Sequence, residues 1–529
     1  MRVVVTRMDA WTAAGRGVEC LIDALVVGQS LSRQLEGYSA PVASIPEAVD
    51  AETLLAEVVA GVLPRHKGRV GLVVATTSGA ISGAFEAWMR RGAPAGEERG
   101  WRAEPGRAVA RRLGLDPVLT ISVACASGTA AFEIGAAWLR AGRCDAVVVA
   151  GVEKHSLYIH AGFAGLGALG PNGARPFAAD RDGLLLGEGA AAVLLEPADH
   201  ADLALAELLA VATSQDAFHL TAPRPDGAGL SRAINAALAR AGLTAGEVDV
   251  VSGHGTGTVL NDAAEARSLA AVFGPQVPLH GIKGVVGHCL GAAGVIEAVV
   301  CVAAFGGAAL PSPPHSPLLG VRVATRVDTC VSVNAAFGGV NAAVVFRRAT
   351  LATPPGAPSW PPAPPPSPAP PAATTSRLAS FEAPALPLAE IWPSAPPALG
   401  RADRYVRAGV RLLRDVASHV DEHTLLVLHS ATDCRAADHR YYAGVPARGI
   451  AGASRLHFPY TIPGSPLAEG SIAAGLGNPA WVLCEGDVDR IDPATLLRGS
   501  GYRRMVVFSV EAPSDDAHTP ARASATLYT

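Results

Sequence analysis

A proline-rich segment places the strongest constraint on how this chain of 529 residues can fold. Between Thr353 and Ser376 the sequence runs Pro-Pro-Gly-Ala-Pro-Ser-Trp-Pro-Pro-Ala-Pro-Pro-Pro-Ser-Pro-Ala-Pro-Pro. Proline has a fixed φ angle and no amide hydrogen, so this stretch is predicted to be an extended spacer; a docking motif is the alternative. We therefore expect two domains, residues 1–352 and 377–529, joined by a linker at 353–376.

The composition is typical of a compact α/β enzyme, since 49% of the residues are hydrophobic, 17% are charged and 57 are glycine. A formal charge of -4 without a basic stripe argues against nucleic-acid binding. Eight scattered cysteines without a Cys-x-x-Cys pair indicate a reducing cytoplasm and no metal site. The longest apolar segment, around 291–310, is interrupted by Glu297, so membrane insertion is not expected.

Before the linker, short runs that favour strands alternate with helical patterns. Strands are predicted at residues 70–76, 119–124, 145–152, 248–254, 277–282 and 331–346, and helices at 126–141, 262–273 and 291–305. Strands separated by helices indicate parallel βαβ units, whose functional sites lie at the carboxyl ends of the strands.

Three candidate catalytic residues fall at such strand ends. Cys125 lies in Ile121-Ser-Val-Ala-Cys-Ala-Ser-Gly128, His254 in Gly253-His-Gly-Thr-Gly-Thr258, and His288 in Lys283-Gly-Val-Val-Gly-His-Cys-Leu-Gly-Ala-Ala-Gly294. A cysteine that opens a helix is expected to gain thiolate character from the helix N-terminus. One thiol and two imidazoles suit thioester chemistry. A single buried cysteine or histidine is more often an inert residue of the core. The placement of all three residues at strand ends favours a functional site.

The segment from about 119 to 346 resembles the β-ketoacyl synthases, the decarboxylating condensing enzymes of fatty-acid and polyketide assembly. The resemblance rests on the three motifs above and on Arg175-Pro-Phe-Ala-Ala-Asp-Arg-Asp-Gly-Leu-Leu-Leu-Gly-Glu-Gly189 and Asn334-Ala-Ala-Phe-Gly-Gly-Val-Asn341, all in the expected order. It implies an α/β fold of the thiolase type, with αβαβα layers.

The resemblance also implies roles for the site residues. Cys125 would accept an acyl group from a carrier-protein thioester, and His254 and His288 would assist loss of carbon dioxide from a malonyl-type thioester and stabilise the enolate. The oxyanion hole would be formed by the backbone amides of Cys125 and Phe337, with Gly338 beside them in the pocket.

Supporting residues follow from the same resemblance. Lys283 would pair with Glu265, and with Glu297 as a second carboxylate, to fix the histidine loop; a surface ion pair is the structural alternative. Thr256 and Thr258 would hydrogen-bond the phosphopantetheine arm, or else would cap the helix that begins near residue 262.

The implied partners are an acyl carrier protein, which carries the acyl and malonyl-type substrates on phosphopantetheine, and a second subunit in a homodimer or a ketosynthase/chain-length-factor-like heterodimer. No cofactor bound to the enzyme is expected. Two alternatives remain open: a non-catalytic chain-length-factor-like partner, which would usually lack Cys125, and a thiolase-like acyl-CoA enzyme, which would carry a second catalytic cysteine near the C-terminal glycine motif.

The chain departs from the family pattern in two places. The region between about 83 and 118 looks abbreviated, and Ala335-Ala336 shortens the glycine motif before Phe337. After the linker, a helix at 401–414, a strand at 424–430 and a loop and helix at 458–471 resemble only the N-terminal half of a synthase. We expect this half domain to be a non-catalytic partial copy, with Cys484 near the position of Cys125. Half of a thiolase-type fold would leave a sheet edge and an apolar face uncovered, so residues 377–529 are expected to pack on the first domain or on another chain.

Overall fold

The computed structural model describes residues 1–64, 68–81, 102–201, 203–308, 310, 318, 320–321, 326–349, 374–383, 402–430, 434–448, 452–484, 492–511 and 521–529. Two regions singled out in the sequence lie partly outside these residues, namely the predicted linker up to residue 373 and residues 83–101 of the abbreviated region.

The first half-sheet of the N-terminal part ends at the strand that precedes Cys125. Its strands are neighbours in the order β6 (Val118–Ile121), β5 (Val70–Ala75), β7 (Ala146–Glu153), β9 (Gly189–Pro197) and β1 (Val3–Thr12). β6, β5 and β7 are parallel, whereas β9 is antiparallel to both β7 and β1. The apolar strand β7 is buried along its whole length, as expected of a strand covered on both faces.

The second half-sheet carries the strand that precedes His254. Its order is β13 (Leu279–His280), β11 (Val250–Ser252), β15 (Thr329–Ala335), β16 (Val340–Arg348) and β10 (Ala206–Gln215). β11 is parallel to β13 and β15, and the other neighbours are antiparallel. A short antiparallel pairing of β1 with β10 joins the two half-sheets.

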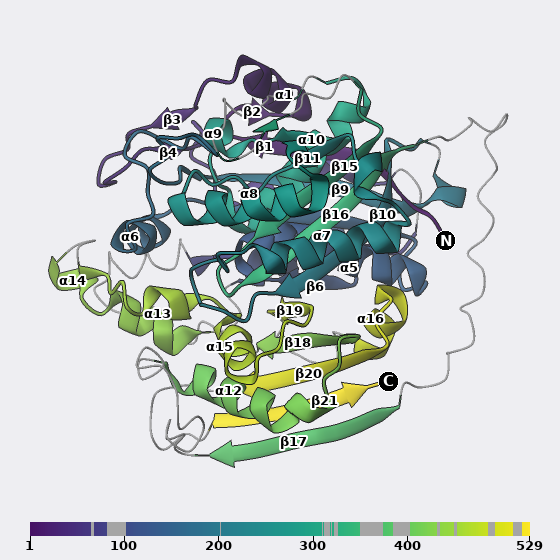
Figure 1. The fold of residues 1–529 in the computed structure, drawn as a ribbon, viewed down its shortest axis with the longest axis vertical. Coiled ribbons are helices and arrows are strands. Elements are labelled where there is room, and N and C mark those ends of the chain that lie inside the picture. Colours follow the sequence, from purple (N-terminus) through teal and green to yellow (C-terminus); the bar gives the residue numbers. More distant parts are fainter. Residues whose placement is uncertain are drawn as a thin grey trace.

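Helices form three layers around the two half-sheets (Figure 1). The central layer consists of α5 (Ser127–Arg140) and α10 (Ala293–Phe305), which contact strands of both half-sheets. α2 (Ala51–Val62) and α4 (Glu104–Leu113) cover one outer face, and α7 (Ala228–Ala241) and α8 (Val259–Phe273) cover the other. The resulting αβαβα order agrees with the predicted thiolase-type fold.

Small residues let the two central helices cross closely. A β-carbon added to Gly128 of α5 would lie 2.7 Å from the backbone nitrogen of Val295, and one added to Gly294 of α10 would lie 2.4 Å from the nitrogen of Thr129. Both contacts are closer than side-chain carbons tolerate, so glycine is needed on each helix. This close crossing brings the motif that contains Cys125 beside the motif that contains His288.

The C-terminal part contains a half-sheet with the same design as the first half-sheet, and the two are neighbours at strand β6. Its strands follow the order β19 (Ala480–Leu483), β18 (Thr424–Ser430), β20 (Arg504–Glu511), β21 (Ala521–Tyr528) and β17 (Thr375–Ala383). β18 is parallel to β19 and β20, and β21 is antiparallel to β20 and β17. Order and direction match β6, β5, β7, β9 and β1 strand for strand. α12 (Arg404–Val416) packs on β20, β21 and β17 and on α15 (Ser465–Ala474), while α16 (Pro493–Ser500) packs against the strands and α5.

The two repeats meet edge to edge, as Figure 1 shows for β6 and β19. These strands are antiparallel, with Ile121 opposite Leu483, and the amide of Ser122 donates to the carbonyl oxygen of Val482 at 2.9 Å. The sheet therefore runs from the N-terminal part into the C-terminal part, and of the two expected possibilities, packing on the first domain or on another chain, the structure shows packing on the first domain.

A buried polar contact reinforces this junction. Trp481 Nε1 donates to Glu133 Oε2 of α5 at 3.1 Å, and Arg240 Nη1 donates to the other carboxylate oxygen at 2.7 Å. The Arg240 guanidinium also lies 4.5 Å from the ring centre of Tyr502. Because Glu133 is buried and accepts from Trp481 of the C-terminal part, separating the two parts would remove one hydrogen-bond donor from a buried carboxyl group and leave it with Arg240.

Most predicted elements are present, with four differences. The predicted strand at 277–282 is divided into two short strands of different sheets, β12 (Gln276–Val277) and β13. The predicted strand at 331–346 is a hairpin of two antiparallel strands, β15 and β16. Helix α8 begins at Val259, three residues before the expected start. Strand β17 begins at Thr375, inside the expected linker. Among the helices that the structure describes, none is long and apolar enough to span a bilayer.

Candidate active site

Cys125 lies in a tight turn between β6 and α5. The turn contains the 3-10 segment Ala124–Ala126, and Ala124 has a φ angle of 49°, which is rare for a residue other than glycine. Ser127 Oγ accepts from the amide of Val123 at 2.9 Å and donates to the carbonyl of Ala124 at 2.6 Å. These bonds hold the strained turn, and the turn directs the cysteine side chain into a cavity.

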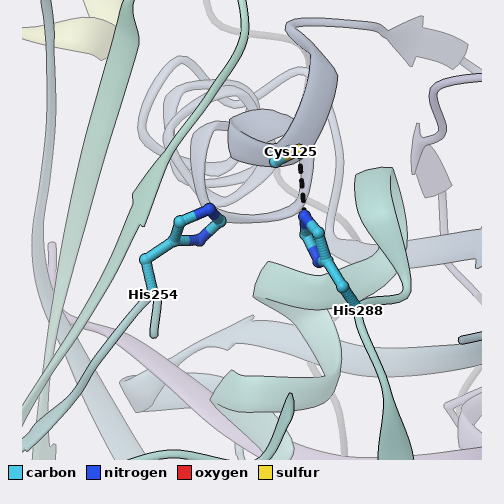
Figure 2. A group of neighbouring side chains, drawn as sticks. All are labelled: Cys125, His254 and His288. Carbon is cyan, nitrogen blue, oxygen red and sulfur yellow. Dashed lines mark hydrogen bonds between the residues drawn. The ribbon is translucent and has the colours of Figure 1, made fainter. Parts of the chain in front are cut away.

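His288 lies in a turn of similar construction. It precedes the 3-10 segment Leu290–Ala292 and helix α10, and Leu290 has a φ angle of 41°. The backbone of His288 pairs with Leu185 at 2.7 Å and Gly187 at 3.0 Å. His288 Nε2 lies 3.0 Å from Cys125 Sγ, the contact dashed in Figure 2.

His254 follows strand β11 and faces the other two residues (Figure 2). The rings of His254 and His288 meet edge to face with centres 5.2 Å apart. One ring nitrogen of each histidine and Cys125 Sγ all lie within 4.8 Å of one another. Asn334 Nδ2 donates to His254 Nδ1 at 3.1 Å, so a neutral His254 carries its proton on Nε2. The structure thus brings together the three residues singled out in the sequence.

Burial sets the charge state of all three residues. Desolvation raises the pKa of the Cys125 thiol to about 12, an effect that the positive charge of Lys283 only partly offsets. The expectation of thiolate character is therefore wrong for the resting site, because loss of solvent outweighs the helix N-terminus. Burial, and then Lys283, hold the pKa values of His254 and His288 well below the usual value, so both rings are neutral at neutral pH.

Two backbone amides point at the sulfur. Hydrogen bonds from the amides of Cys125 and Phe337 act to lower the pKa of the thiol. Phe337 and Gly338 lie in the turn between β15 and β16, where Gly338 has a φ angle of 84° and donates its amide to Leu220 at 2.6 Å. A cysteine and two histidines at this spacing can also bind a metal ion, but donors aimed at the sulfur fit a developing anion better.

Lys283 pairs with Glu297 and not with Glu265. Lys283 Nζ contacts Glu297 Oε1, and both side chains are almost fully buried, so the alternative of a surface ion pair is wrong. Glu297 Oε2 also accepts from Asn334 Nδ2 at 2.9 Å. Glu265 instead accepts from the amides of His254 at 2.6 Å and Gly255 at 2.8 Å, and burial raises its pKa to about 8. Each carboxylate thus positions the site, one through Lys283 and one through the His254 loop.

A cavity of about 310 Å³ leads to the three residues. Thr256 and Thr258 line it, and their hydroxyl oxygens lie 2.9 Å apart. Thr258 stands at the N-cap of α8, but its side chain makes no capping hydrogen bond, which argues against the structural alternative. Val259 and Leu260 also line the cavity and are 56% and 65% exposed, so they mark its mouth.

Two residues of the site had no role assigned from the sequence. Asn334 hydrogen-bonds both His254 and Glu297. The sequence motif that contains Asn334 points to the family, but it predicted no role for this side chain. Glu153 ends β7 and accepts from the amides of Thr77 at 2.7 Å, Ser78 at 3.0 Å and Gly291 at 3.1 Å. In the sequence, Glu153 is a single carboxylate at the end of an otherwise apolar strand, and this pattern could have indicated a functional role. Glu153 ties the turn that follows His288 to the loop after β5.

Cys484 follows β19 as Cys125 follows β6. Its amide donates to the carbonyl of Thr120 at 2.9 Å, so it lies at the junction of the two repeats. It is buried and is not among the residues that line the cavity.

Models of one protein family match the N-terminal part of the chain. The model described as "Beta-ketoacyl synthase, N-terminal domain" matches residues 58–201, and "Beta-ketoacyl synthase, C-terminal domain" matches residues 205–316. Nodulation protein E of Rhizobium meliloti is 34% identical over 271 residues, which are 47% of this chain and 67% of that protein. The 3-oxoacyl-[acyl-carrier-protein] synthase 2 of Rhizobium meliloti (strain 1021) is 34% identical over 261 residues, 44% of this chain and 61% of that protein.

Solved structures extend the likeness to the C-terminal part. The ishigamide ketosynthase/chain length factor covers 66% of this chain and 99% of its own, with a TM-score of 0.59 and 27% identity. The PfaC keto synthase-chain length factor covers 100% of this chain and 78% of its own, with a TM-score of 0.79 at 15% identity, which shows the fold alone. The thiolase-type fold is confirmed, and with its Cys-His-His arrangement the chain belongs to the β-ketoacyl synthase family of condensing enzymes.

Proposed function

We propose that this chain catalyses a decarboxylative Claisen condensation between an acyl group held on Cys125 and a malonyl-type thioester on an acyl carrier protein. The observation that carries the proposal is the contact of a neutral thiol with a neutral imidazole, His288, beside a second imidazole, His254, in one cavity. A nucleophile next to a base, with oxyanion donors at the same atom, is the arrangement that acyl transfer requires.

In the first half-reaction the Cys125 sulfur attacks the carbonyl carbon of an acyl thioester. The thiol has a pKa of about 12, so it must give up its proton during the attack, and His288 Nε2 at 3.0 Å is placed to receive it. The amides of Cys125 and Phe337 stabilise the oxyanion. The tetrahedral intermediate then expels the carrier thiol, which regains a proton from His288, and the acyl group remains on the sulfur.

In the second half-reaction the malonyl-type thioester loses carbon dioxide, and the electrons of the broken bond form an enolate. The Nε2 hydrogen that Asn334 imposes on His254 can donate to the enolate oxygen. The enolate carbon attacks the acyl carbonyl, the sulfur of Cys125 leaves as a thiolate, and a proton taken from solvent through His288 restores the thiol. Burial, and then the positive charge of Lys283, keep both imidazoles neutral between these steps.

The proposed substrates arrive on the phosphopantetheine arm of an acyl carrier protein, and no further cofactor takes part. One relative named above is by its name a 3-oxoacyl-[acyl-carrier-protein] synthase, which supports a carrier protein as the partner. Thr256 and Thr258 present hydroxyl groups to the cavity between the exposed mouth and Cys125, where they can bond the amides of such an arm. The cysteine composition of the sequence supports a cytoplasmic location.

We propose that two parts of this one chain pair in the way that two subunits were expected to pair. Residues 377–529 form the proposed second domain after a linker at 353–376, and the matching order of β19-β18-β20-β21-β17 and β6-β5-β7-β9-β1 supports a role in place of a second subunit. The ishigamide protein is by its title a ketosynthase/chain length factor. Cys484 lies away from the cavity lining, which supports a non-catalytic domain.

The experiment is intact-protein mass spectrometry after incubation with acyl-carrier thioesters. The wild-type chain is expected to gain one acyl mass, Cys125→Ala is expected to gain none, and the matched variant Cys484→Ala is expected to gain as much as wild type. An adduct that persists in Cys125→Ala would refute the proposal. A wild-type chain without any adduct would favour the chain-length-factor alternative, and acylation by coenzyme A thioesters alone would favour the thiolase alternative.

A further inference from the structure

A buried arginine connects the C-terminal part of the chain to a loop beside the active site. Arg102 lies two residues before α4, and its side chain is 3% exposed. Its Nη2 donates to the carbonyl oxygen of Thr461 at 2.8 Å and lies 3.9 Å from Asp438 Oδ1, both in the C-terminal part. Its Nε donates to the carbonyl oxygen of Thr77 at 2.8 Å. One guanidinium group therefore joins the two parts of the chain.

The loop that accepts from Arg102 follows strand β5 and is packed tightly. A β-carbon added to Gly79, which has a φ angle of 54°, would lie 2.4 Å from the α-carbon of Arg102. A β-carbon added to Gly291 would lie 2.6 Å from the carbonyl carbon of Thr76. Both distances are shorter than carbon atoms tolerate, so glycine is needed at each position. The loop is therefore in close contact both with Arg102 and with the turn that follows His288.

A single peptide group connects Arg102 to Glu153. The carbonyl of Thr77 and the amide of Ser78 belong to the same planar peptide unit. Its oxygen accepts from Arg102, and its amide hydrogen donates to Glu153 Oε1 at 3.0 Å. Hydrogen bonds at the two ends of one peptide group polarise each other, so each bond strengthens the other. A change at the guanidinium group is thus felt at the carboxyl group.

Glu153 completes the connection to the turn that holds His288. Its second oxygen, Oε2, accepts from the amide of Gly291 at 3.1 Å. Gly291 lies in the 3-10 segment that follows His288 and that begins with the strained φ angle of Leu290. Glu153 is 1% exposed, and no ion pair between described residues includes it. Amide and hydroxyl donors are therefore what fix this carboxyl group, and through it they fix the turn.

In the proposed mechanism the position of His288 decides the rate of acyl transfer. His288 Nε2 lies 3.0 Å from Cys125 Sγ and is the proposed base for the thiol proton. A displacement of about 1 Å at such a group can cost about 100-fold in rate. His254, the proposed donor to the enolate, is held separately by Glu265 and Asn334. Loosening the turn after His288 should therefore impair one half-reaction and spare the other.

We propose that Arg102 is a positioning residue for acyl transfer, which acts through the Thr77–Ser78 peptide group and Glu153 on the turn that holds His288. This inference rests on the proposed condensation reaction. The carbonyl oxygen of Thr461 anchors the guanidinium group from the C-terminal part, so the alignment of the base depends on a contact between the two parts of the chain.

The test compares Arg102→Gln with Arg240→Gln in the full chain. Arg240 also pairs with a buried carboxylate, Glu133, and contacts Tyr502 of the C-terminal part, so its loss perturbs the same junction. Among the described residues, its hydrogen bonds do not involve the loop after β5. Rapid-quench mass spectrometry measures acyl transfer to Cys125, and labelled carbon dioxide measures decarboxylation of a malonyl-type thioester.

We expect Arg102→Gln to slow acyl transfer by roughly tenfold or more and to leave the release of carbon dioxide within a few-fold of wild type. Arg240→Gln should keep both rates within a few-fold. Arg102→Lys is the second variant, because it retains the charge but cannot donate to two carbonyl oxygens as the guanidinium group does. It should show the same loss in acyl transfer alone.

Two double variants separate positioning from a general loss of structure. In a His288→Ala background the base is already absent, so adding Arg102→Gln should not slow acylation further. Glu153→Gln breaks the same connection at its next member. A chain with both Arg102→Gln and Glu153→Gln should therefore acylate no more slowly than one with Glu153→Gln alone.

Several outcomes would overturn the inference. Wild-type acylation rates in both Arg102 variants would show that the connection does not align the base. Equal slowing with and without His288, or equal slowing of both half-reactions, would show a purely structural role for Arg102. A wild-type chain that takes no acyl group would instead refute the proposed function, and the inference with it.

Discussion

Replacing His288 by alanine tests how the buried thiol loses its proton. The pKa of Cys125 rises from 9.0 to about 12 on burial, which costs about 4 kcal/mol for forming the thiolate. At pH 7.5 only about one thiol in 10⁴ to 10⁵ is then ionised. His288 Nε2, the proposed base, lies 3.0 Å from the sulfur, and a positioned base contributes about 10² to 10⁴ in rate. We expect His288→Ala to slow acylation of Cys125 by about 100-fold or more.

His254→Ala is the matched control for this experiment. His254 is an equally buried, neutral imidazole in the same cavity, but Asn334 donates to its Nδ1, and the imidazole that accepts from the Cys125 thiol is His288. We expect its acylation rate to stay within a few-fold of wild type, while release of carbon dioxide from a malonyl-type thioester is lost. Rapid-quench mass spectrometry measures the first step, and labelled carbon dioxide measures the second.

Equal acylation rates in the two histidine variants would refute the reasoning. They would mean that the amides of Cys125 and Phe337 alone activate the sulfur, and that the short contact between His288 and Cys125 has no part in acyl transfer. A loss of acylation in His254→Ala as large as that in His288→Ala would also contradict the assignment of the thiol proton to His288.

Other perturbations probe the ion pair, the helix crossing and the thiol. Lys283→Met leaves Glu297 buried without its cation, so the free energy of unfolding in urea should fall by about 3–5 kcal/mol, and adding Glu297→Gln should restore much of it. No recovery would argue against the pairing. Gly294→Ala places a carbon 2.4 Å from backbone on α5 and should greatly lower the melting temperature, unlike Gly246→Ala, whose nearest atom is 4.0 Å away. Alkylation of Cys125 by iodoacetamide should still accelerate beyond pH 10, since burial raises the pKa of its thiol; a plateau near pH 9 would contradict this.

Local patterns in the sequence were sufficient to predict most helices and strands and the residues that carry the reacting atoms. The apolar run before Cys125 and the small residues after it specify a strand, a turn and a helix, whereas His288 follows the short helix α9 (Lys283–Val286) and precedes α10. The three residues were expected to meet at strand ends, and they do meet, although Cys125 and His254 follow strands of different half-sheets.

Contacts between distant segments could not be predicted in the same way. Whether Lys283 meets Glu265 or Glu297 depends on the crossing of α10, and both carboxylates lie at plausible sequence distances. The pKa of Cys125 depends on how completely the fold excludes water, which no motif encodes. The ring of Phe458 from the C-terminal part packs on Phe163 of the N-terminal part, a contact between segments that lie far apart in the chain and share no local pattern.

The strand that completes the sheet edge at β6 belongs to the same polypeptide as the nucleophile. In an assembly of separate subunits, dilution shifts the equilibrium towards free protomers and removes groups that the neighbour contributes. Here the two strands belong to one chain, so the pairing of β19 with β6 does not depend on how dilute the protein is. Synthesis of one chain also guarantees a one-to-one ratio of the two strand repeats.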